Sequence, residues 1–587
     1  MRLVETRILE GPNVYRLEPV VKLELAVGRR RTFYGQREPG RHALVRLGAA
    51  VPARDWPDGV ATVAAWIRRL RGEAGEGKRG LAVHRSSDPG HWIVTFPWLG
   101  AERALTLAEA AVSLATREVS PSRTAHLTGG QERLLARWRT RLAASRATPP
   151  TWIRDTDRRV PIISISGTNG KTTVTRLITH ILLRSGRHVG TTTSDGVLID
   201  ERMVDPGDWT GPGGARQILA RHDVEVAVLE TARGGIVLRG VGYESNEASV
   251  LTNVSADHLD LQGIHTLPEL AEVKSTICRI TRPDGWVVLN ADDPLVHAVA
   301  RRTRARVALF SMAGEASPAI RRHLAGGGRA YAVRDGTIIE ADGTGRTEIV
   351  EVQRVPITIG GLARHNVANA LAAAGGARAM GATVEQVRDG LVGFAPDAAR
   401  SPGRLNLFRL GARVVVVDFA HNEAGLAAIL DVAEGIAAGA AGRTAPITAI
   451  IGTAGDRPDD TLRGIGRIAA LRAQRVAIKE TRRYLRGRTA ESVVGELLAG
   501  IKVGGVASAE VPVYPDETRA LQAELNGPPG TGGDGSRPDA ARVIVLMCHQ
   551  ERDEVFELLA RAGARPVDVA SELTQLVPRL QGRPRRG

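Results

Sequence analysis

Short apolar runs alternate with longer amphipathic segments over most of the chain from residue 161 onward. Runs such as 162–166, 224–231 and 285–293 have the length of buried strands and are rich in Val and Ile, whereas apolar residues in 171–186 recur at helical spacing. Strands that alternate with helices favour a parallel sheet with right-handed crossovers. The pattern therefore predicts an α/β domain with a central parallel sheet over residues 151–400.

The alternation is interrupted once and then resumes. Residues 329–361 read as β-hairpins with Asp-Gly turns, and 364–381 as a helix. Four further apolar runs follow residue 401, at 412–420, 447–455, 475–480 and 541–549. The part 401–587 is thus predicted to be a second, smaller α/β domain of Rossmann-like type.

The first 150 residues lack this regular alternation. Residues 2–28 predict two strands around a Gly-Pro-Asn turn, and apolar spacing predicts helices within 61–72, 106–119 and 130–145. A proline-containing stretch near residue 150 then breaks regular structure and indicates a linker. We expect an α+β N-terminal domain over residues 1–150.

Composition narrows the class of protein. The chain of 587 residues has a formal charge of +15, which favours anionic partners such as nucleotides, polyacids or nucleic acid, or reflects only an arginine-rich composition. Aromatic residues at 4% do not favour a base-stacking surface. With two cysteines, an N-terminus without an apolar signal segment and no membrane-length apolar run, we expect a soluble cytoplasmic protein that binds neither membrane nor nucleic acid.

The stretch 165–173 (ISGTNGKTT) lies between the first strand and the first helix of the central domain. Gly167 and Gly170 let backbone N–H groups turn toward a phosphate, and the following helix adds its positive N-terminal end. The Lys171 ammonium suits the β- and γ-phosphates, and the Thr172 hydroxyl suits Mg²⁺. This short G-x-x-G-K-T loop predicts nucleotide binding through Gly167, Thr168, Asn169, Gly170, Lys171, Thr172 and Thr173.

Three further polar residues lie near the ends of predicted elements. Glu230 closes a predicted strand and is followed by Arg233, and a carboxylate beside a phosphate loop is suited to hold a metal ion. His258 follows the next predicted strand, and Lys274 lies on a helix soon after. A surface glutamate, a structural histidine and a solvated lysine are the ordinary alternatives for each residue taken alone.

Taken together, these stretches resemble the Mur ligase family. The phosphate loop, Glu230 and four segments occur in that family's order: NVSADHLD (253–260), AEVK (271–274), GLARHNVANALAA (361–373) and VVVVDFAHN (414–422). Within the family, three further segments look most like the ligase half of the cyanophycin synthetases: LETARGGIVLRG (229–240), GTAGDRPDD (452–460) and IKETRRYLRGR (478–488). Residues 1–150 are similar to the N-terminal domain of those enzymes.

The resemblance implies ATP-dependent joining of a carboxylate to an amine. The carboxylate would attack the γ-phosphate of ATP to give an acyl phosphate, which an amine, often that of an amino acid, would capture. Matching positions imply that Lys171, Glu230, His258 and Lys274 act in catalysis, with Mg²⁺ on Thr172, Glu230 and His258. In relatives, the lysine that matches Lys274 is carbamylated.

The same matching extends to the nucleotide and the substrates. Asn366 and Asn369 match positions near the adenine, and Arg404 and Asp418 match positions that reach the nucleotide from the C-terminal domain. Four residues are candidates for substrate contact: Arg233, His421, Asp456 and Arg457. The acidic loop 452–460 could bind a cationic amine such as arginine and the basic segment 479–488 an acidic acceptor, although an ordinary polar surface accounts for either.

One departure from the resemblance is large. Cyanophycin synthetases carry an ATP-grasp domain between their N-terminal and Mur-like parts, whereas this chain passes from one to the other directly. We therefore expect the ligase half-reaction and not cyanophycin synthesis unaided. Three alternatives stay open: an amide ligase, a non-catalytic or partner-dependent subunit of a separate ligase or amidotransferase, and an NTPase acting on nucleic acid. Relatives often self-associate, so a homo-oligomer is among the expected assemblies.

Overall fold

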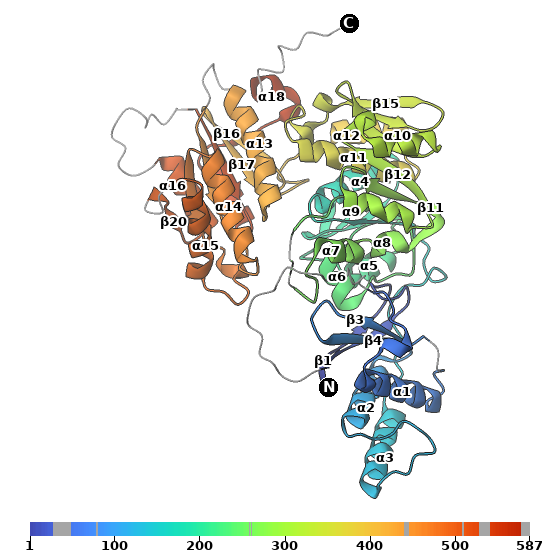
Figure 1. Cartoon of the computed structure of the whole chain (residues 1–587). Coiled ribbons are helices and arrows are strands. Elements are labelled where there is room, and N and C mark those ends of the chain that lie inside the picture. The colour runs from blue at the N-terminus through green and yellow to red at the C-terminus, as the bar shows by residue number, and fades with distance from the viewer. Residues whose placement is uncertain are drawn as a thin grey trace.

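Three sheets organise the protein, and the largest lies between the other two (Figure 1). The computed structural model describes residues 1–27, 48–77, 80–256, 259, 261–439, 445–506, 510–527 and 541–576. The strands of the three sheets fall within 1–150, 151–400 and 401–587, which we call the N-terminal, central and C-terminal units. The domain boundaries at 150 and 400 themselves stay a prediction.

The central sheet has eleven strands, of which the seven in the middle are parallel. Their order is β15-β14-β13-β12-β11-β10-β5-β9-β6-β7-β8, with antiparallel strands only at the two edges. The strands are β5 (Ile162–Ser166), β6 (Val189–Thr192), β7 (Gly196–Ile199), β8 (Arg202–Pro206), β9 (Val226–Glu230), β10 (Asn246–Leu251), β11 (Thr281–Asn290), β12 (Arg306–Ser311), β13 (Arg329–Arg334), β14 (Thr337–Ala341) and β15 (Arg346–Glu351). The predicted parallel α/β arrangement is confirmed.

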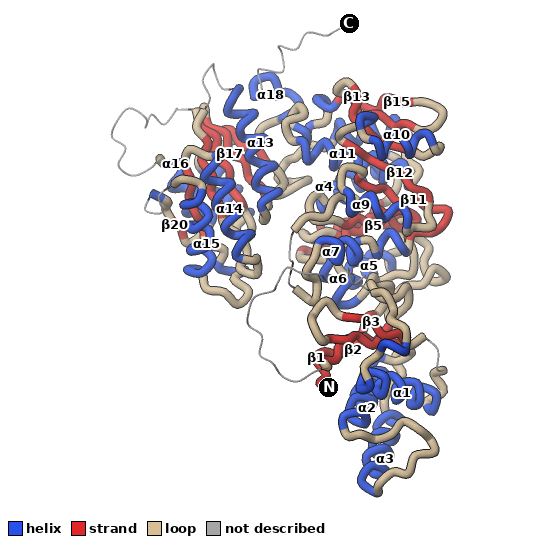
Figure 2. The backbone as a smooth tube through the Cα atoms, in the orientation of Figure 1, coloured by secondary structure: helices blue, strands red, loops and turns tan. Residues whose placement is uncertain are grey.

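Helices cover both faces of this sheet (Figure 2). On one face, the buried side of the strands packs against α4 (Lys171–Arg184), α11 (Arg364–Ala379) and α12 (Val384–Gly393). The other face packs against α5 (Pro212–Leu219), α6 (Arg233–Arg239), α7 (Leu267–Lys274), α8 (Thr276–Arg279), α9 (Pro294–His297) and α10 (Pro318–Ala325). Because both faces are buried, the strands are apolar at successive positions instead of alternating.

The C-terminal unit repeats this plan on a smaller scale. Its sheet has the order β20-β19-β18-β21-β17-β16-β22, parallel from β20 to β17. The strands are β16 (Asn406–Leu410), β17 (Arg413–Asp418), β18 (Ile447–Ile451), β19 (Arg475–Lys479), β20 (Val513–Tyr514), β21 (Arg542–Met547) and β22 (Arg565–Pro566). One face carries α13 (Glu423–Gly439), α14 (Asp459–Arg472), α15 (Ala490–Val503) and α18 (Val569–Leu576), and the other α16 (Glu517–Asn526) and α17 (Arg552–Arg561).

The N-terminal unit is an antiparallel sheet with helices on one side. The strands β1 (Arg2–Leu9), β2 (Val20–Ala26), β3 (Ala82–Arg85) and β4 (His91–Pro97) pair in the order β1-β2-β4-β3. The helix α1 (Asp58–Glu73) and the helix α2 (Ala101–Thr116) cover the sheet, and α3 (Gly129–Ala144) packs on α2. The predicted pair of strands and three helices are present, whereas the hairpin β3–β4 was not predicted.

One of the predicted Asp-Gly turns is present in the hairpin of β13 and β14. Asp335 and Gly336, between these strands, have φ of 49° and 79°, the left-handed pair that an Asp-Gly hairpin turn requires. Within the described residues, no helix has both the length and the apolar composition needed to cross a membrane.

Candidate active site

The predicted phosphate loop runs from the end of β5 to the start of α4. Its two glycines have positive φ angles, and neighbouring side chains leave no room for a Cβ atom. Gly170 caps α4 with φ 85°, and Gly167 has φ 149°. A Cβ atom on Gly170 would lie 2.2 Å from Asn369 Oδ1, and one on Gly167 would lie 1.9 Å from Thr252 Oγ1. A side chain is therefore excluded at both positions.

Thr252 and Asn253, directly after β10, hold the loop from the neighbouring strand. The Asn253 side chain accepts a hydrogen bond from Asn169 N at 2.9 Å and donates one to Asn169 O at 2.9 Å. Thr252 Oγ1 donates to the same carbonyl at 2.7 Å, and Thr168 N donates to Asn253 O at 2.8 Å. The protein itself thus fixes the loop conformation.

Two lysines donate hydrogen bonds to carbonyl groups of the loop, one from the loop itself and one from a distant helix. Lys171 Nζ donates to Thr168 O at 2.8 Å, and Lys274 Nζ, at the end of α7, donates to Gly167 O at 2.6 Å. Lys274 is 5% exposed, so the alternative of a solvated helical lysine is wrong. Thr266 starts α7 with a capping box to Glu269, and this short helix thereby aims its last residue at the phosphate loop.

Glu230, the last residue of β9, is 3% exposed and lies beside Thr172 and Ser194. Its carboxylate accepts hydrogen bonds from Ser194 N at 3.3 Å and from the Thr172 hydroxyl. Burial raises the pKa of Glu230, although the cations Lys171 and Arg404 act in the opposite direction. A buried carboxylate whose charge is incompletely compensated, next to a hydroxyl, is a set of oxygen donors that suits Mg²⁺.

Arg404 brings the C-terminal unit to the same place. Its guanidinium donates to Thr172 Oγ1 at 3.4 Å and to Ser194 Oγ at 3.5 Å, and it stacks over the Phe419 ring at 4.6 Å. Asp418, at the end of β17, accepts from Leu405 N at 2.7 Å and so fixes the segment that carries Arg404. Burial raises the pKa of Asp418, opposed by Arg404.

Asp195 links the same two units by ion pairs. One carboxylate oxygen accepts from Arg176 on α4 at 2.9 Å, and the other accepts from Arg552 on α17 at 3.0 Å. Burial would raise the pKa of Asp195, but Arg404, Arg176 and Arg552 together lower it. Asp195 follows Ser194, so the interdomain link lies one residue from the surroundings of Glu230.

Sequence reasoning missed this link, because no local signal for it was present. Asp195 lies in the polar run Thr191–Asp195, which begins within the short strand β6, and Arg552 lies in the segment after β21. Nothing in either segment indicates that the two side chains meet, because the contact joins parts of the chain 357 positions apart.

The other predicted residues have the following contacts. Asn369 Nδ2 donates to Asn366 Oδ1 at 2.9 Å, and its Oδ1 approaches Gly170. His421 forms a hydrogen bond through Nδ1 with Phe419 O at 3.1 Å, and Arg233 donates to Leu261 O at 3.2 Å. His258 lies outside the described residues, so its role as a Mg²⁺ ligand stays a prediction.

The two loops expected to bind substrates contact each other. Asp456 pairs with Arg486, and Asp459 pairs with Arg488 at 2.7 Å. The acidic loop and the basic segment thus neutralise part of each other's charge. Segment 479–488 begins with the buried Lys479 at the end of β19 and continues as one exposed 3-10 turn, Arg482–Tyr484, so an ordinary polar surface stays an alternative for its arginines.

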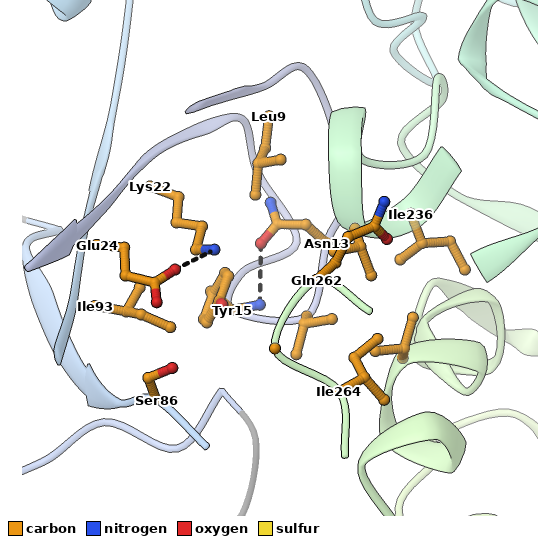
Figure 3. A pocket seen from close by; sticks show the side chains of 14 residues that line it. Leu9, Asn13, Tyr15, Lys22, Glu24, Ser86, Ile93, Ile236, Gln262 and Ile264 are labelled. Carbon is orange, nitrogen blue, oxygen red and sulfur yellow. Dashed lines mark hydrogen bonds and ion pairs between the residues drawn. The ribbon is translucent and has the colours of Figure 1, made fainter. Parts of the chain in front are cut away.

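A small pocket lies between the N-terminal sheet and the central unit (Figure 3). Lys22 and Glu24 on β2 and Tyr15 line one side, and Ile236 on α6 and Gln262 line the other. Ligand atoms of Glu24, Asp88 and His91 beside it lie within 4.8 Å of one another, but Lys22 Nζ is 3.0 Å from Glu24, and this ammonium already compensates the carboxylate. We therefore assign no metal site there.

Comparisons with known proteins agree with the resemblance. The Mur ligase middle domain matches residues 165–377, which include the phosphate loop, Glu230, Lys274 and both asparagines. The central unit thus contains a segment that is similar to this domain.

The chain is also similar to particular curated proteins. It is 41% identical to the cyanophycin synthetase of Synechocystis sp. over 371 residues, which are 63% of this chain and 41% of that enzyme. It is 35% identical to the UDP-N-acetylmuramoylalanine–D-glutamate ligase of Symbiobacterium thermophilum over 236 residues, which are 40% of this chain and 45% of that enzyme. The chain thus spans about two fifths of the length of the cyanophycin synthetases it matches.

Among solved structures, E. coli FolC in complex with ADP, without folate substrate, aligns with 69% of this chain and 90% of its own. The sequence identity is 18% and the TM-score is 0.49.

Proposed function

We propose that this chain is an ATP-dependent carboxylate–amine ligase that forms an amide bond through an acyl phosphate. One observation carries the proposal: Lys171, Thr172 and the buried Glu230 meet at one sheet edge, and Arg404 from another unit reaches the same threonine. A site completed by two units suits an intermediate that must be kept from water. The relatives named above are ligases, which supports the same reaction class.

The reaction has two steps. An oxygen of the acid attacks the γ-phosphorus of ATP and ADP leaves, and the amine nitrogen then attacks the acyl carbon as phosphate leaves and a proton is lost from nitrogen. The first step needs charge neutralisation more than covalent help. Lys171 and Arg404 supply positive charge beside the phosphate loop, whose N–H groups add to it.

Mg²⁺ held by Thr172 and Glu230 would supply further charge neutralisation for the phosphates. The position of Asn369 beside Gly170, and its hydrogen bond to Asn366, support a role of both residues in holding the nucleotide. Correct placement of two substrates can contribute roughly 7–11 kcal/mol of the barrier. The ion pairs of Asp195 and the contacts of Arg404 support such placement, because they set the C-terminal unit against the phosphate loop.

The amine is proposed to be an amino acid, with arginine as the first candidate. Asp456 and Asp459 each bind a guanidinium group of the same chain, so the loop has the chemistry that arginine requires. A free arginine would have to displace Arg486 from Asp456. The acid is proposed to be a small molecule or peptide that carries a carboxylate.

The test is a screen of acids and amines, including arginine, for phosphate release, with the product identified by mass spectrometry. We expect phosphate release that requires both an acid and an amine, a product whose mass is that of the acid plus the amine less one water, and loss of both signals in Lys171→Ala. ATP hydrolysis that no amine or acid changes would contradict the ligase proposal. Turnover that appears only after a separate ligase is added would favour the partner-dependent subunit.

A further inference from the structure

A second group of buried charges lies at the edge of the C-terminal sheet, outside the site described above. Lys479 at the end of β19 is 1% exposed, and Glu517 at the start of α16 is fully buried. Lys479 Nζ donates to Glu517 Oε1 at 2.6 Å, to Thr481 Oγ1 at 3.1 Å and to His549 Nδ1 at 2.8 Å. All three protons of the ammonium are used, so this group needs no outside ligand.

Glu517 is saturated in the same way. Its oxygens accept from the backbone N–H groups of His549 at 2.7 Å, Gln550 at 3.1 Å and Glu551 at 2.9 Å, and from Cys548 Sγ at 3.2 Å. The carboxylate therefore fixes the turn that follows β21. The buried ion pair joins this turn to β19 through a set of short hydrogen bonds.

His549 connects this turn to the segment that follows the neighbouring strand β17. Its Nε2 lies 2.9 Å from Ala420 O, and because a carbonyl only accepts, the proton is on Nε2 and Nδ1 is the acceptor that faces Lys479. The imidazole ring also packs edge-on against Phe419 at 5.2 Å. Phe419 has Arg404 stacked over it at 4.6 Å. Arg404 and His549 thus hold the same aromatic ring.

The segment 419–422 in turn contacts the phosphate loop. Asn422 Nδ2 donates to Asn169 Oδ1 at 3.2 Å across the two units, and Thr453 Oγ1 donates to His421 O at 3.1 Å. A chain of contacts therefore runs from the buried pair through His549 to the segment that places Arg404 and Asn422 at the nucleotide-binding edge.

We propose that Lys479, Glu517 and His549 are positioning residues that hold segment 419–422, and with it Arg404, against the phosphate loop. The proposal rests on the proposed function for its kinetic consequence. Its structural consequence, the order of segment 419–422, can be measured without any activity.

Two variants break the network at different points. His549→Phe keeps a ring against Phe419 but removes the donor to Ala420, and Lys479→Met removes the ammonium from Glu517 and His549. His549→Gln is the conservative variant, since an amide can still donate to Ala420. If Lys479→Met does not fold, the comparison of His549→Phe with His549→Gln still tests the proposal.

The chain offers a matched control on the same strand and helix. Arg475, at the other end of β19, forms two hydrogen bonds at 2.7 and 2.9 Å with Glu524, which is 1% exposed on α16. Arg475→Met also breaks a β19–α16 ion pair, one whose arginine is partly exposed, but it does not touch segment 419–422.

Hydrogen exchange of the full chain is the first measurement. We expect amides of 419–422 to exchange at least about fivefold faster in His549→Phe and Lys479→Met, with no change there in Arg475→Met. In the ligase assay, kcat/KM should fall ~10- to 100-fold in the first two variants and recover largely in His549→Gln. Binding of ADP to the phosphate loop should change little, because the central unit supplies that loop.

Unchanged exchange in 419–422, or equal acceleration in Arg475→Met, would overturn the proposal. Equal loss of kcat/KM in Arg475→Met would also overturn it, since the effect would then be general destabilisation. Absence of ligase activity in the unmodified chain would contradict the proposed function only, and the exchange experiment would still decide on the network.

Discussion

The two large sheets each bury a carboxylate near the carboxyl ends of their parallel strands, and the surroundings of the two differ. Burial raises the pKa of Glu230 in the central sheet despite nearby cations. Burial would also raise the pKa of Glu517, but Lys479, His549 and backbone N–H groups lower it to about 2. Glu517 has short bonds to an ammonium and to three backbone donors, whereas Glu230 has a hydroxyl and one long backbone contact.

We call the region of Glu230 and the phosphate loop the open site, and the group of Lys479, Glu517 and His549 the closed network. They differ in whether the protein itself satisfies the buried charges. Both regions are buried and charged, so burial and charge alone mark neither as functional. The C-terminal network satisfies its own charges and therefore stabilises a conformation. The central edge leaves a carboxylate incompletely compensated beside a loop shaped for phosphate, and therefore suits a bound cation and nucleotide.

The largest expected effect comes from removing the cation of the open site. Lys171→Ala should lower ATP turnover by ~10³-fold, because the phosphates lose their fixed positive charge. Phosphate release under saturating substrates measures it. Lys22→Met is the control, since it removes a lysine that is paired with Glu5 and Glu24 in the N-terminal sheet, away from the phosphate loop. Retention of more than a tenth of the activity in Lys171→Ala would contradict the role of the phosphate loop in ATP turnover.

Acid should affect the closed network in one direction. Lys479, His549 and Cys548 face Glu517, whose pKa is about 2 in the folded state against ~4.3 unfolded. The contribution of ionised Glu517 to the free energy of unfolding is therefore complete above pH ~4.3. It is lost as the pH falls toward 2, and the loss amounts to at most about 3 kcal/mol.

Hydrogen exchange of β19 and β21 amides at pH 5 and pH 3, corrected for the intrinsic rate, measures this loss. Glu517→Gln should remove most of the pH dependence between these values. An equal pH dependence in the variant and in the unmodified chain would show that Glu517 is not the group responsible.

The link between the two units should behave as a coupled pair. Asp195→Asn and Arg552→Gln should each lower kcat/KM, and the double variant should fall little further, with a coupling energy of about 0.5–3 kcal/mol. The pair Glu10–Arg216, 2.9 Å apart between the N-terminal and central units, is the control. Additive effects of Asp195→Asn and Arg552→Gln would mean that the ion pair does not hold the units together during turnover.

The smallest expected effect concerns the amine. If arginine is the amine, Arg486→Ala should lower the KM for arginine roughly two- to fivefold. The reason is that Arg486 no longer competes with free arginine for Asp456, at a partly exposed site where such an ion pair is weak. Steady-state rates at varied arginine give the value. Arg565→Ala, which breaks a pair with Glu572 elsewhere in the same unit, should leave the KM unchanged. A raised KM in Arg486→Ala would place Arg486 itself in substrate binding.

Much of the fold follows from local pattern. Buried apolar runs such as β5, β9 and β17 could be predicted because strands buried on both faces are continuously apolar. The strands β6–β8 could not, since β6 and β7 have only four residues each and β8 is largely exposed. The phosphate loop was predictable because its glycines are required by the backbone itself.

The closed network could not be predicted in the same way. Lys479 lies in a segment with four arginines, and only the fold shows that this one cation is buried among β19, α16 and the turn after β21. Glu517 and His549 lie 38 and 70 positions away along the chain. Local sequence carries no signal for such a contact.

Thermal unfolding with and without Mg²⁺ and ATP tests the contrast between the two carboxylates most directly. In the unmodified chain, ligand at 100 times its Kd should stabilise the central unit by about 2.7 kcal/mol. Glu517→Gln should be destabilised by roughly 3–5 kcal/mol and keep this ligand response. Glu230→Gln should be no less stable without ligand and should lose the response. A full response to Mg²⁺ and ATP in Glu230→Gln would contradict the account.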